Sequence, residues 1–384
     1  MTIDDGEASV ISRRRLGVRW RQIDVRLLAA TVALVGLGIA LVASATWHFS
    51  DNPGIVGNTW LAKHLAFVLI GFGVSFLCLT VDPRLIRAGA FGIYGFSLIT
   101  LLAVLALGHG SADYGAQRWI EVGGIPLQPS EPAKLALIIV LARVLAGEGT
   151  EERKLILATA LTVVPCVLIY LQPGLGTALT LIATWFGMLV LSGTSRRYIL
   201  GLIGLGVVAT PIALLGLRGY MLDRLRIFLD PGADALGEGY NILQAQISIG
   251  SGGMWGKGLL EGSQTQLRYL RVSHSDFIFS VLGEELGFVG AMVFFALLLV
   301  LISRGLRGYE LAGDRFTSLV CAGVVSMIAF QSVINLGANV GLTPVTGIPL
   351  PFVSYGGSAL ITQLAAVGLM QAAFVRRRLY RFET

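Results

Sequence analysis

Residues 277–303 read FIFSVLGEELGFVGAMVFFALLLVLIS. This apolar stretch exceeds the roughly 20 residues that cross the hydrocarbon core of a bilayer as a helix. Only helices and closed barrels satisfy every backbone polar group in lipid, and long unbroken apolar runs exclude a barrel. The stretch therefore predicts a membrane-spanning helix, although it contains two acids, Glu284 and Glu285.

Similar apolar runs recur along the whole chain. Of its 384 residues, 54% are hydrophobic and only 14% are charged, whereas about a quarter of a soluble globular chain is charged. The sequence therefore predicts an all-α, polytopic integral membrane protein, a single domain over 1–384 with about ten transmembrane helices. The expected spans are 24–46, 62–81, 87–108, 130–147, 154–171, 174–193, 198–217, 277–303, 316–338 and 359–375.

Arginine and lysine clusters predict the topology of these spans. Basic residues mark the cytoplasmic side of a membrane protein, and clusters occur in the N-terminal arm 1–23, in alternate loops and in the tail 376–384. An even number of spans with both termini in the cytoplasm accounts for each cluster. The net charge of +6 is thus explained by topology, and no nucleic-acid partner is expected.

The segment 218–275 is the large hydrophilic loop between the seventh and eighth spans. Its position predicts an extracytoplasmic location, and its aromatic residues predict a folded cap, part of it lying along the membrane interface. A glycine-rich run at 248–258 includes Lys257 but lacks the ending of a phosphate-binding P-loop.

Charged residues at the edges of spans are expensive and are candidates for function. Glu131 and Lys134 are three apart, on one face of a helix, and follow Arg118. They predict either a structural ion pair or a polar wall for a phosphate-bearing headgroup. Asp276 follows His274 and precedes the eighth span. It predicts either a helix cap or a general base whose pKa is raised by desolvation.

The stretch 335–358 contains three prolines and several glycines near membrane depth. Such a backbone cannot form a regular helix, so it has to be buried in protein or to line a polar cavity. We expect a broken, re-entrant segment beside a substrate cavity.

Four groups of residues resemble the SEDS family (shape, elongation, division and sporulation) over nearly the whole chain. They are Arg118-Trp119-Ile120 with Gln128-Pro129-Ser130-Glu131, the glycine run 250–258, His274-Ser275-Asp276-Phe277-Ile278-Phe279 with Gly283-Glu284-Glu285-Leu286-Gly287, and Pro344–Phe352 with Ser354-Tyr355-Gly356-Gly357-Ser358.

The resemblance implies a peptidoglycan glycosyltransferase of the bacterial cytoplasmic membrane, with its active face outside the cell. It would polymerise lipid II with inversion at the anomeric carbon and release undecaprenyl pyrophosphate. Asp276 would be the catalytic base. The residues implied to bind substrate are Arg118, Glu131, Lys134, Lys257, His274 and Ser354, and those implied to support the site are Glu284, Glu285, Pro349, Pro351, Gly356 and Gly357.

The same resemblance implies partners: a class B penicillin-binding protein and other membrane proteins of the elongation machinery. No metal site is predicted, and a requirement for a divalent cation, Mg²⁺ or Mn²⁺, is left open. The family usually has aspartate where this chain has Gly174. That acid is dispensable, or another such as Glu131 replaces it, or the protein is less active. A lipid II flippase, a division-type paralogue and a scaffold for a partner are the alternative functions.

Overall fold

The computed structural model describes residues 22–47, 59–108, 118–122, 125–216, 219–234, 237–270 and 272–376. Within these ranges, one helix occupies each predicted span, with boundaries that differ by a few residues except at the end of the eighth. These helices are α1 (Val25–Ala45), α2 (Thr59–Thr80), α3 (Pro83–Leu107), α4 (Ser130–Leu145), α5 (Glu151–Leu171), α6 (Leu175–Leu191), α7 (Arg196–Leu215), α11 (Ile278–Leu311), α12 (Arg315–Asn339) and α13 (Gly357–Val375).

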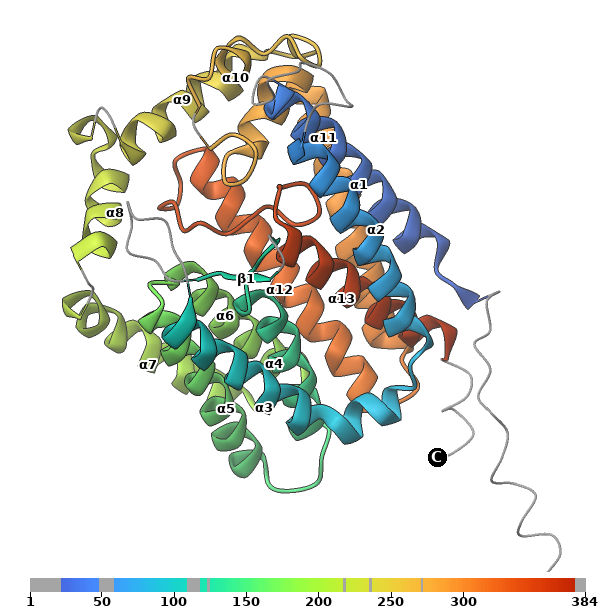
Figure 1. Ribbon diagram of the computed structural model, residues 1–384. Helices are drawn as coiled ribbons and strands as arrows, with labels where there is room; N and C mark the ends of the chain where they lie inside the picture. Colours follow the sequence, from blue (N-terminus) through green and yellow to red (C-terminus); the bar gives the residue numbers. More distant parts are fainter. Residues whose placement is uncertain are drawn as a thin grey trace, which may run out of the picture.

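The remaining elements lie in connecting segments. A short hairpin, β1 (Ile120–Val122) and β2 (Ile125–Leu127), precedes α4. The large loop carries α8 (Gly219–Leu229), the 3₁₀ turn η4 (Pro231–Ala233), α9 (Glu238–Ser251) and α10 (Ser263–Gln266). Figure 1 shows α9 and α10 across one end of the bundle, with α8 beside them above α7. The side of the membrane on which this loop lies remains a prediction.

The outer surface of the bundle is suited to lipid. Among the described helices, α1, α2, α3, α5, α11, α12 and α13 are long and apolar enough to cross a membrane. Large apolar side chains of α7 are 47–69% exposed: Leu200, Ile203, Leu205, Val207 and Val208. In water such a surface would be an aggregation or interaction site, whereas in a bilayer it contacts hydrocarbon.

The centre of the bundle is formed by α12 and α13, with α1 and α2 on one side and α3 to α7 on the other (Figure 1). The apolar core of α13 is 89% buried within the protein. Nearly all of α4 is buried as well, so this helix of 16 residues is shielded by its neighbours even though it is too short to span the bilayer alone.

Helix ends at one face of the bundle are closed by side chains. Asp24, Asp82, Thr150 and Asp314 cap the N-termini of α1, α3, α5 and α12. Asp24 also forms an ion pair with Arg304 of α11, and its backbone exchanges hydrogen bonds with Gln371 of α13. The beginning of α1 and the end of α13 therefore lie at the same face, as an even number of spans requires.

The helix α11 is broken at Gly287, where φ is 64° and ψ is −161°. The glycine-rich run fills the break, because Lys257 N–H donates to the Glu284 carbonyl at 3.0 Å and Phe288 N–H donates to the Gly253 carbonyl at 2.9 Å. Backbone groups that the helix leaves open are thus satisfied by the loop, which binds the outer cap to α11.

The close packing of α2 against α13 provides a test of the fold. A Cβ added at Gly368 of α13 would lie 2.2 Å from the Ser75 carbonyl oxygen of α2, whereas one added at Gly73 meets nothing within 4 Å. We expect Gly368→Ala to destabilise the protein by about 1–3 kcal/mol through overpacking. Gly73→Ala should be neutral or stabilising by up to about 1 kcal/mol. Thermal unfolding in detergent measures both, and equal effects would contradict this packing.

Candidate active site

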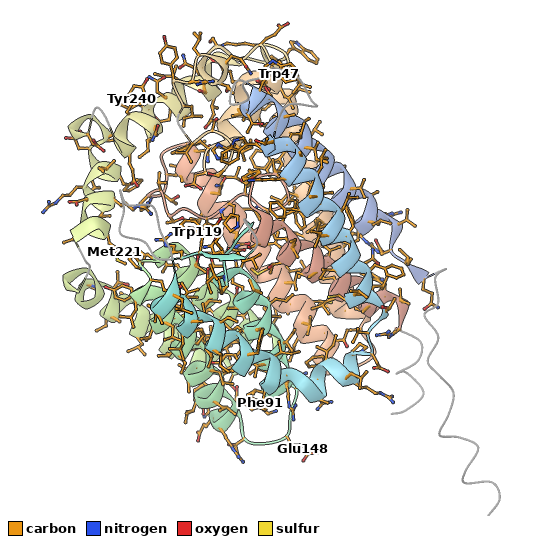
Figure 2. The ribbon with its side chains drawn as sticks, in the orientation of Figure 1. Trp47, Phe91, Trp119, Glu148, Met221 and Tyr240 are labelled. Carbon is orange, nitrogen blue, oxygen red and sulfur yellow. The ribbon has the colours of Figure 1, made fainter. Side chains whose placement is uncertain are left out.

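A cavity of about 440 Å³ lies where the outer cap meets the bundle. Its walls come from the β1–β2 hairpin, α8, α9, the segment before α11 and the segment between α12 and α13. Figure 2 shows Trp119, one of the lining residues, between Met221 of α8 and the central helices in that view. The polar and charged residues that line the cavity are Arg118, Gln128, Arg224, Glu238, Asn241, Ser275, Asp276, Tyr355 and Ser358.

Asp276 lies in the wall of this cavity, partly exposed to it. It does not cap α11, because Phe277 precedes the helix and no side chain caps that N-terminus at the expected position. Burial raises the pKa of the Asp276 carboxyl above its ordinary value, and Arg224 and a hydrogen bond from Ser275 oppose this effect. A carboxyl group in such surroundings is able to accept a proton.

Two asparagines of α12 hold the backbone at Asp276. The side-chain amides of Asn335 and Asn339 both donate to the Asp276 carbonyl, at 3.0 and 2.9 Å. The Asn339 Oδ1 atom also accepts hydrogen bonds from the backbone N–H and the hydroxyl of Ser280, at 3.2 and 2.7 Å. Asn339 therefore satisfies the first turn of α11 and fixes the preceding acid at the same time. Sequence reasoning missed both roles, although the two asparagines begin the proline-rich stretch.

The irregular segment between α12 and α13 supports the same backbone from the other side. Ser354 donates its hydroxyl to the Ser275 carbonyl at 2.7 Å and accepts from the Leu350 N–H at 2.8 Å. Tyr355 N–H donates to the His274 carbonyl at 2.9 Å. The prediction of a broken segment buried in protein is confirmed, since residues 340–356 form no helix or strand and much of the segment is buried.

Four supporting residues of this segment were predicted, and three of them reach the cavity. Pro349, Gly356 and Gly357 line it, whereas Pro351 does not appear in its wall. A Cβ at Gly357 would lie 2.6 Å from the Phe67 ring, so a larger residue at the beginning of α13 would displace a lining side chain. Ser354 is 4% exposed, and both of its hydrogen bonds are internal. The structure thus assigns it to support of the backbone rather than to substrate binding.

Arg118 lies at the cavity beside Gly347. Its guanidinium donates to the backbone carbonyls of Gln172 and Pro173, at the end of α5. These carbonyls hold Arg118 immediately before Gly174, where relatives with aspartate would place a carboxylate. A Cβ at Gly174 would lie 2.7 Å from Ile169 Cγ2, so the local packing suits glycine.

Glu131 and Lys134 form a buried ion pair, with Lys134 Nζ 2.8 Å from Glu131 Oε1. Their side chains are only 2–3% exposed, and neither lines the cavity. The prediction that Glu131 orients Lys134 is therefore confirmed, but the pair lies within the bundle. It does not form the expected polar wall in this conformation, and Glu131 does not replace the missing acid at position 174.

Lys257 is held by Glu284 of α11 at 2.9 Å and by the Ser263 hydroxyl at 2.8 Å. Glu284 also accepts from the backbone N–H groups of Gln264 and Thr265. The structure thus places Lys257 in the connection between the loop and α11, not in the cavity. Glu284 has the predicted supporting role in this connection.

Glu285 is fully buried and accepts a hydrogen bond from the Ser44 hydroxyl of α1. His274 lies in an aromatic cluster with Trp60 and Tyr355, at ring-centroid distances of 5.0 and 5.7 Å. Burial lowers the pKa of His274, so its side chain is neutral near pH 7. It packs behind the cavity wall that Tyr355 forms.

The second carboxylate of the cavity is Glu238, at the beginning of α9. It accepts a hydrogen bond from Arg224 of α8 at 2.9 Å, in an ion pair with side chains 22% and 21% exposed. Sequence reasoning missed this pair, because a charge in a long hydrophilic loop has no signal that distinguishes it from a solvated one. In the part of the chain that the structure describes, no three His, Cys, Asp or Glu side chains gather to hold a metal ion.

The fold and cavity define a class: a polytopic helical membrane protein with an acid and two arginines in a cavity at one end. Residues 25–379 match the protein family described as Cell cycle protein, FtsW/RodA/SpoVE. The chain belongs to this family.

Curated relatives cover almost the whole chain. The probable peptidoglycan glycosyltransferase FtsW of Trichlorobacter lovleyi is 38% identical over 92% of this chain and 93% of its own length. The peptidoglycan glycosyltransferase MrdB of Escherichia coli K12 is 36% identical over 92% of this chain and 95% of its own.

Solved structures have the same fold. The rod shape determining protein RodA of Thermus thermophilus matches with a TM-score of 0.67 and 29% identity, over 94% of this chain and 98% of that one. A chain from a structure described as a peptidoglycan synthase complex that coordinates polymerization and crosslinking matches with a TM-score of 0.78 and 30% identity, over 95% of this chain and 100% of that one.

The two asparagines give a stability prediction. Asn339→Leu removes the donor to Asp276 and the acceptor for Ser280, so the free energy of unfolding should fall by about 1–3 kcal/mol. Gln331→Met is the matched control on α12, since the buried Gln331 amide has no hydrogen-bond partner among the described residues. The control should be neutral or stabilising. Thermal unfolding in detergent compares the two, and a tolerated Asn339→Leu would contradict the assigned role.

Proposed function

We propose that this chain is a peptidoglycan glycosyltransferase that polymerises lipid II into glycan strands. The observation that carries the proposal is the placement of Asp276 in a cavity that Arg118 and Arg224 also line. Curated relatives described as peptidoglycan glycosyltransferases, similar over more than nine-tenths of the chain, support it.

In this mechanism Asp276 is the general base. Its carboxylate takes the proton from the acceptor sugar hydroxyl while that oxygen attacks the anomeric carbon of the donor. The bond from the anomeric carbon to the diphosphate breaks in the same step, so the configuration inverts and undecaprenyl diphosphate leaves. A raised pKa suits this role, because a base works best when its pKa approaches the working pH.

The two arginines provide electrostatic stabilisation of the leaving group. The diphosphate gains negative charge as its bond to the sugar breaks, and cations placed in advance stabilise that charge at little reorganisation cost. Guanidinium groups suit this task because their planar arrangement of donors matches phosphate oxygens. No step requires a second carboxylic acid, since the diphosphate is already a good leaving group.

The proposed orientation places both termini in the cytoplasm and the cavity at the outer face of the bacterial cytoplasmic membrane. The basic loops support it. Figure 2 shows Trp47 and Tyr240 at the end of the bundle opposite Glu148, as this arrangement requires. Lipid II would then enter from the outer leaflet.

The proposed biological setting is cell-wall elongation with a class B penicillin-binding protein as partner. Two observations support this setting: the fold similarity to the Thermus thermophilus rod shape determining protein, and the similarity to a chain of a complex described as coordinating polymerization with crosslinking. Membrane proteins of the elongation machinery and the need for Mg²⁺ or Mn²⁺ belong to the same proposal. The cavity offers a cation two carboxylates, Asp276 and Glu238, and the latter is paired with Arg224.

The decisive experiment compares the wild type with Asp276→Asn. The purified protein, with and without its penicillin-binding partner, is incubated with lipid II, and the glycan chains are separated on a gel. Asp276→Asn should reduce polymerisation at least 100-fold, because the variant lacks the base. Polymer from the variant at the wild-type rate would refute the role of Asp276. If lipid II is instead translocated by wild type and variant alike and no polymer forms, the chain is a flippase.

The pH dependence of kcat/KM provides a second test. Burial raises the pKa of Asp276, and only the deprotonated carboxylate accepts a proton. The rate should therefore fall as the pH drops through a value above the ordinary carboxylate pKa of about 4. Initial rates of lipid II polymerisation across the acid range measure this limb. A limb at or below about 4 would contradict a desolvated base.

A further inference from the structure

Arg224 is directed into the cavity by the register of α8. Met221 is three residues earlier and is 2% exposed, so both residues lie on the inner face of the helix. Arg226 is two residues later, on the opposite face, and its side chain is 79% exposed. The same helix thus carries one arginine in the cavity and one in solvent, and the distinction comes from the fold alone.

Glu238 meets Arg224 from α9. Glu238 is the first residue of that helix, and Asn241, one turn later, lines the cavity with it. Arg224 and Glu238 therefore connect two separate helices of the cap across the cavity wall. Their side chains remain about one-fifth exposed to the cavity, so another anion that enters is able to reach the guanidinium.

We infer that Arg224 and Glu238 form an exchangeable ion pair, in which Glu238 occupies the guanidinium when the cavity is empty and the diphosphate of a lipid-linked sugar takes its place on binding. This inference rests on the proposed function. A carboxylate and a phosphate oxygen compete for the same donors, and the diphosphate presents more charge and more acceptors. Glu238 is thus a built-in competitor of the substrate.

The pair also positions the charge of Asp276. The Arg224 charge lowers and the Glu238 charge raises the pKa of Asp276. The other groups near this carboxyl are Arg118, the Ser275 hydroxyl, neutral His274 and Tyr355. When the diphosphate binds Arg224, a negative charge comes close to Asp276, which favours the protonated acid that the reaction produces.

Direct binding of farnesyl diphosphate, a lipid diphosphate without sugar, tests the exchange without requiring turnover. The Kd is measured for purified wild type, Arg224→Gln, Glu238→Gln and the double variant. Arg224→Gln should raise Kd roughly tenfold or more, and Glu238→Gln should lower it several-fold. In the double variant the gain from Glu238→Gln should vanish, because the arginine for which it competes is absent.

Matched controls come from the exposed pair on α8. Arg226→Gln and Asp223→Asn make the same changes of charge at side chains that are 79% and 62% exposed, and both should leave Kd within about twofold because solvent and salt screen these charges. The pH limb of kcat/KM should move up for Arg224→Gln and down for Glu238→Gln, since removing a cation raises and removing an anion lowers the pKa of Asp276.

The outcomes separate the pair from the proposed function. Tighter binding by Glu238→Gln cannot arise from misfolding, so it supports the exchange even if no variant makes polymer, in which case only the proposed function fails. If the wild type makes polymer while Glu238→Gln binds the diphosphate equally or more weakly, the pair is purely structural and the inference is overturned. Arg224→Lys should recover part of the affinity in an exchange site.

Discussion

The carbonyl oxygen of Asp276 accepts hydrogen bonds from two asparagines of α12, and the remainder of the site depends on this contact. Unsatisfied backbone groups are costly inside a membrane protein. The chain before α11 is irregular, so its carbonyls need donors, and α12 together with the irregular segment before α13 provides them. The requirement that fixes the fold here also fixes the position of the acid.

Charge pairing distributes the acids of the chain between structure and chemistry. Glu131 is neutralised by Lys134 within the bundle, and Glu284 by Lys257 at the break in α11. Each pair offsets a desolvation cost that an isolated charge would carry in full. Asp276 and Glu238 instead face a cavity with two arginines, where a charge is available to a ligand. The cap helices α8 and α9 create this difference by bringing Arg224 and Glu238 over the site.

Sequence reasoning was most reliable where solvent physics alone sets the structure. The ten predicted spans correspond to helices in the described residues, because burial in lipid demands long apolar runs with few charges. The length of α11 was underestimated, since it continues to Leu311 as an amphipathic extension beyond the apolar run. The break at Gly287 was also missed, because a glycine in a helical pattern does not reveal the loop that fills the gap.

The sequence by itself determined the membrane-spanning class, the order of the helices and the candidacy of Asp276, since these follow from hydropathy, charge placement and a local resemblance. Only the tertiary structure decided which polar residues meet. Lys257 and Ser354 belong to the supporting framework, and Lys134 is sealed inside the bundle. Arg224 and Glu238, fourteen residues apart in an unremarkable loop, reach the cavity. The reason is physical: hydropathy records the cost of placing a residue in lipid or water, but a binding site is defined by long-range contacts between helices.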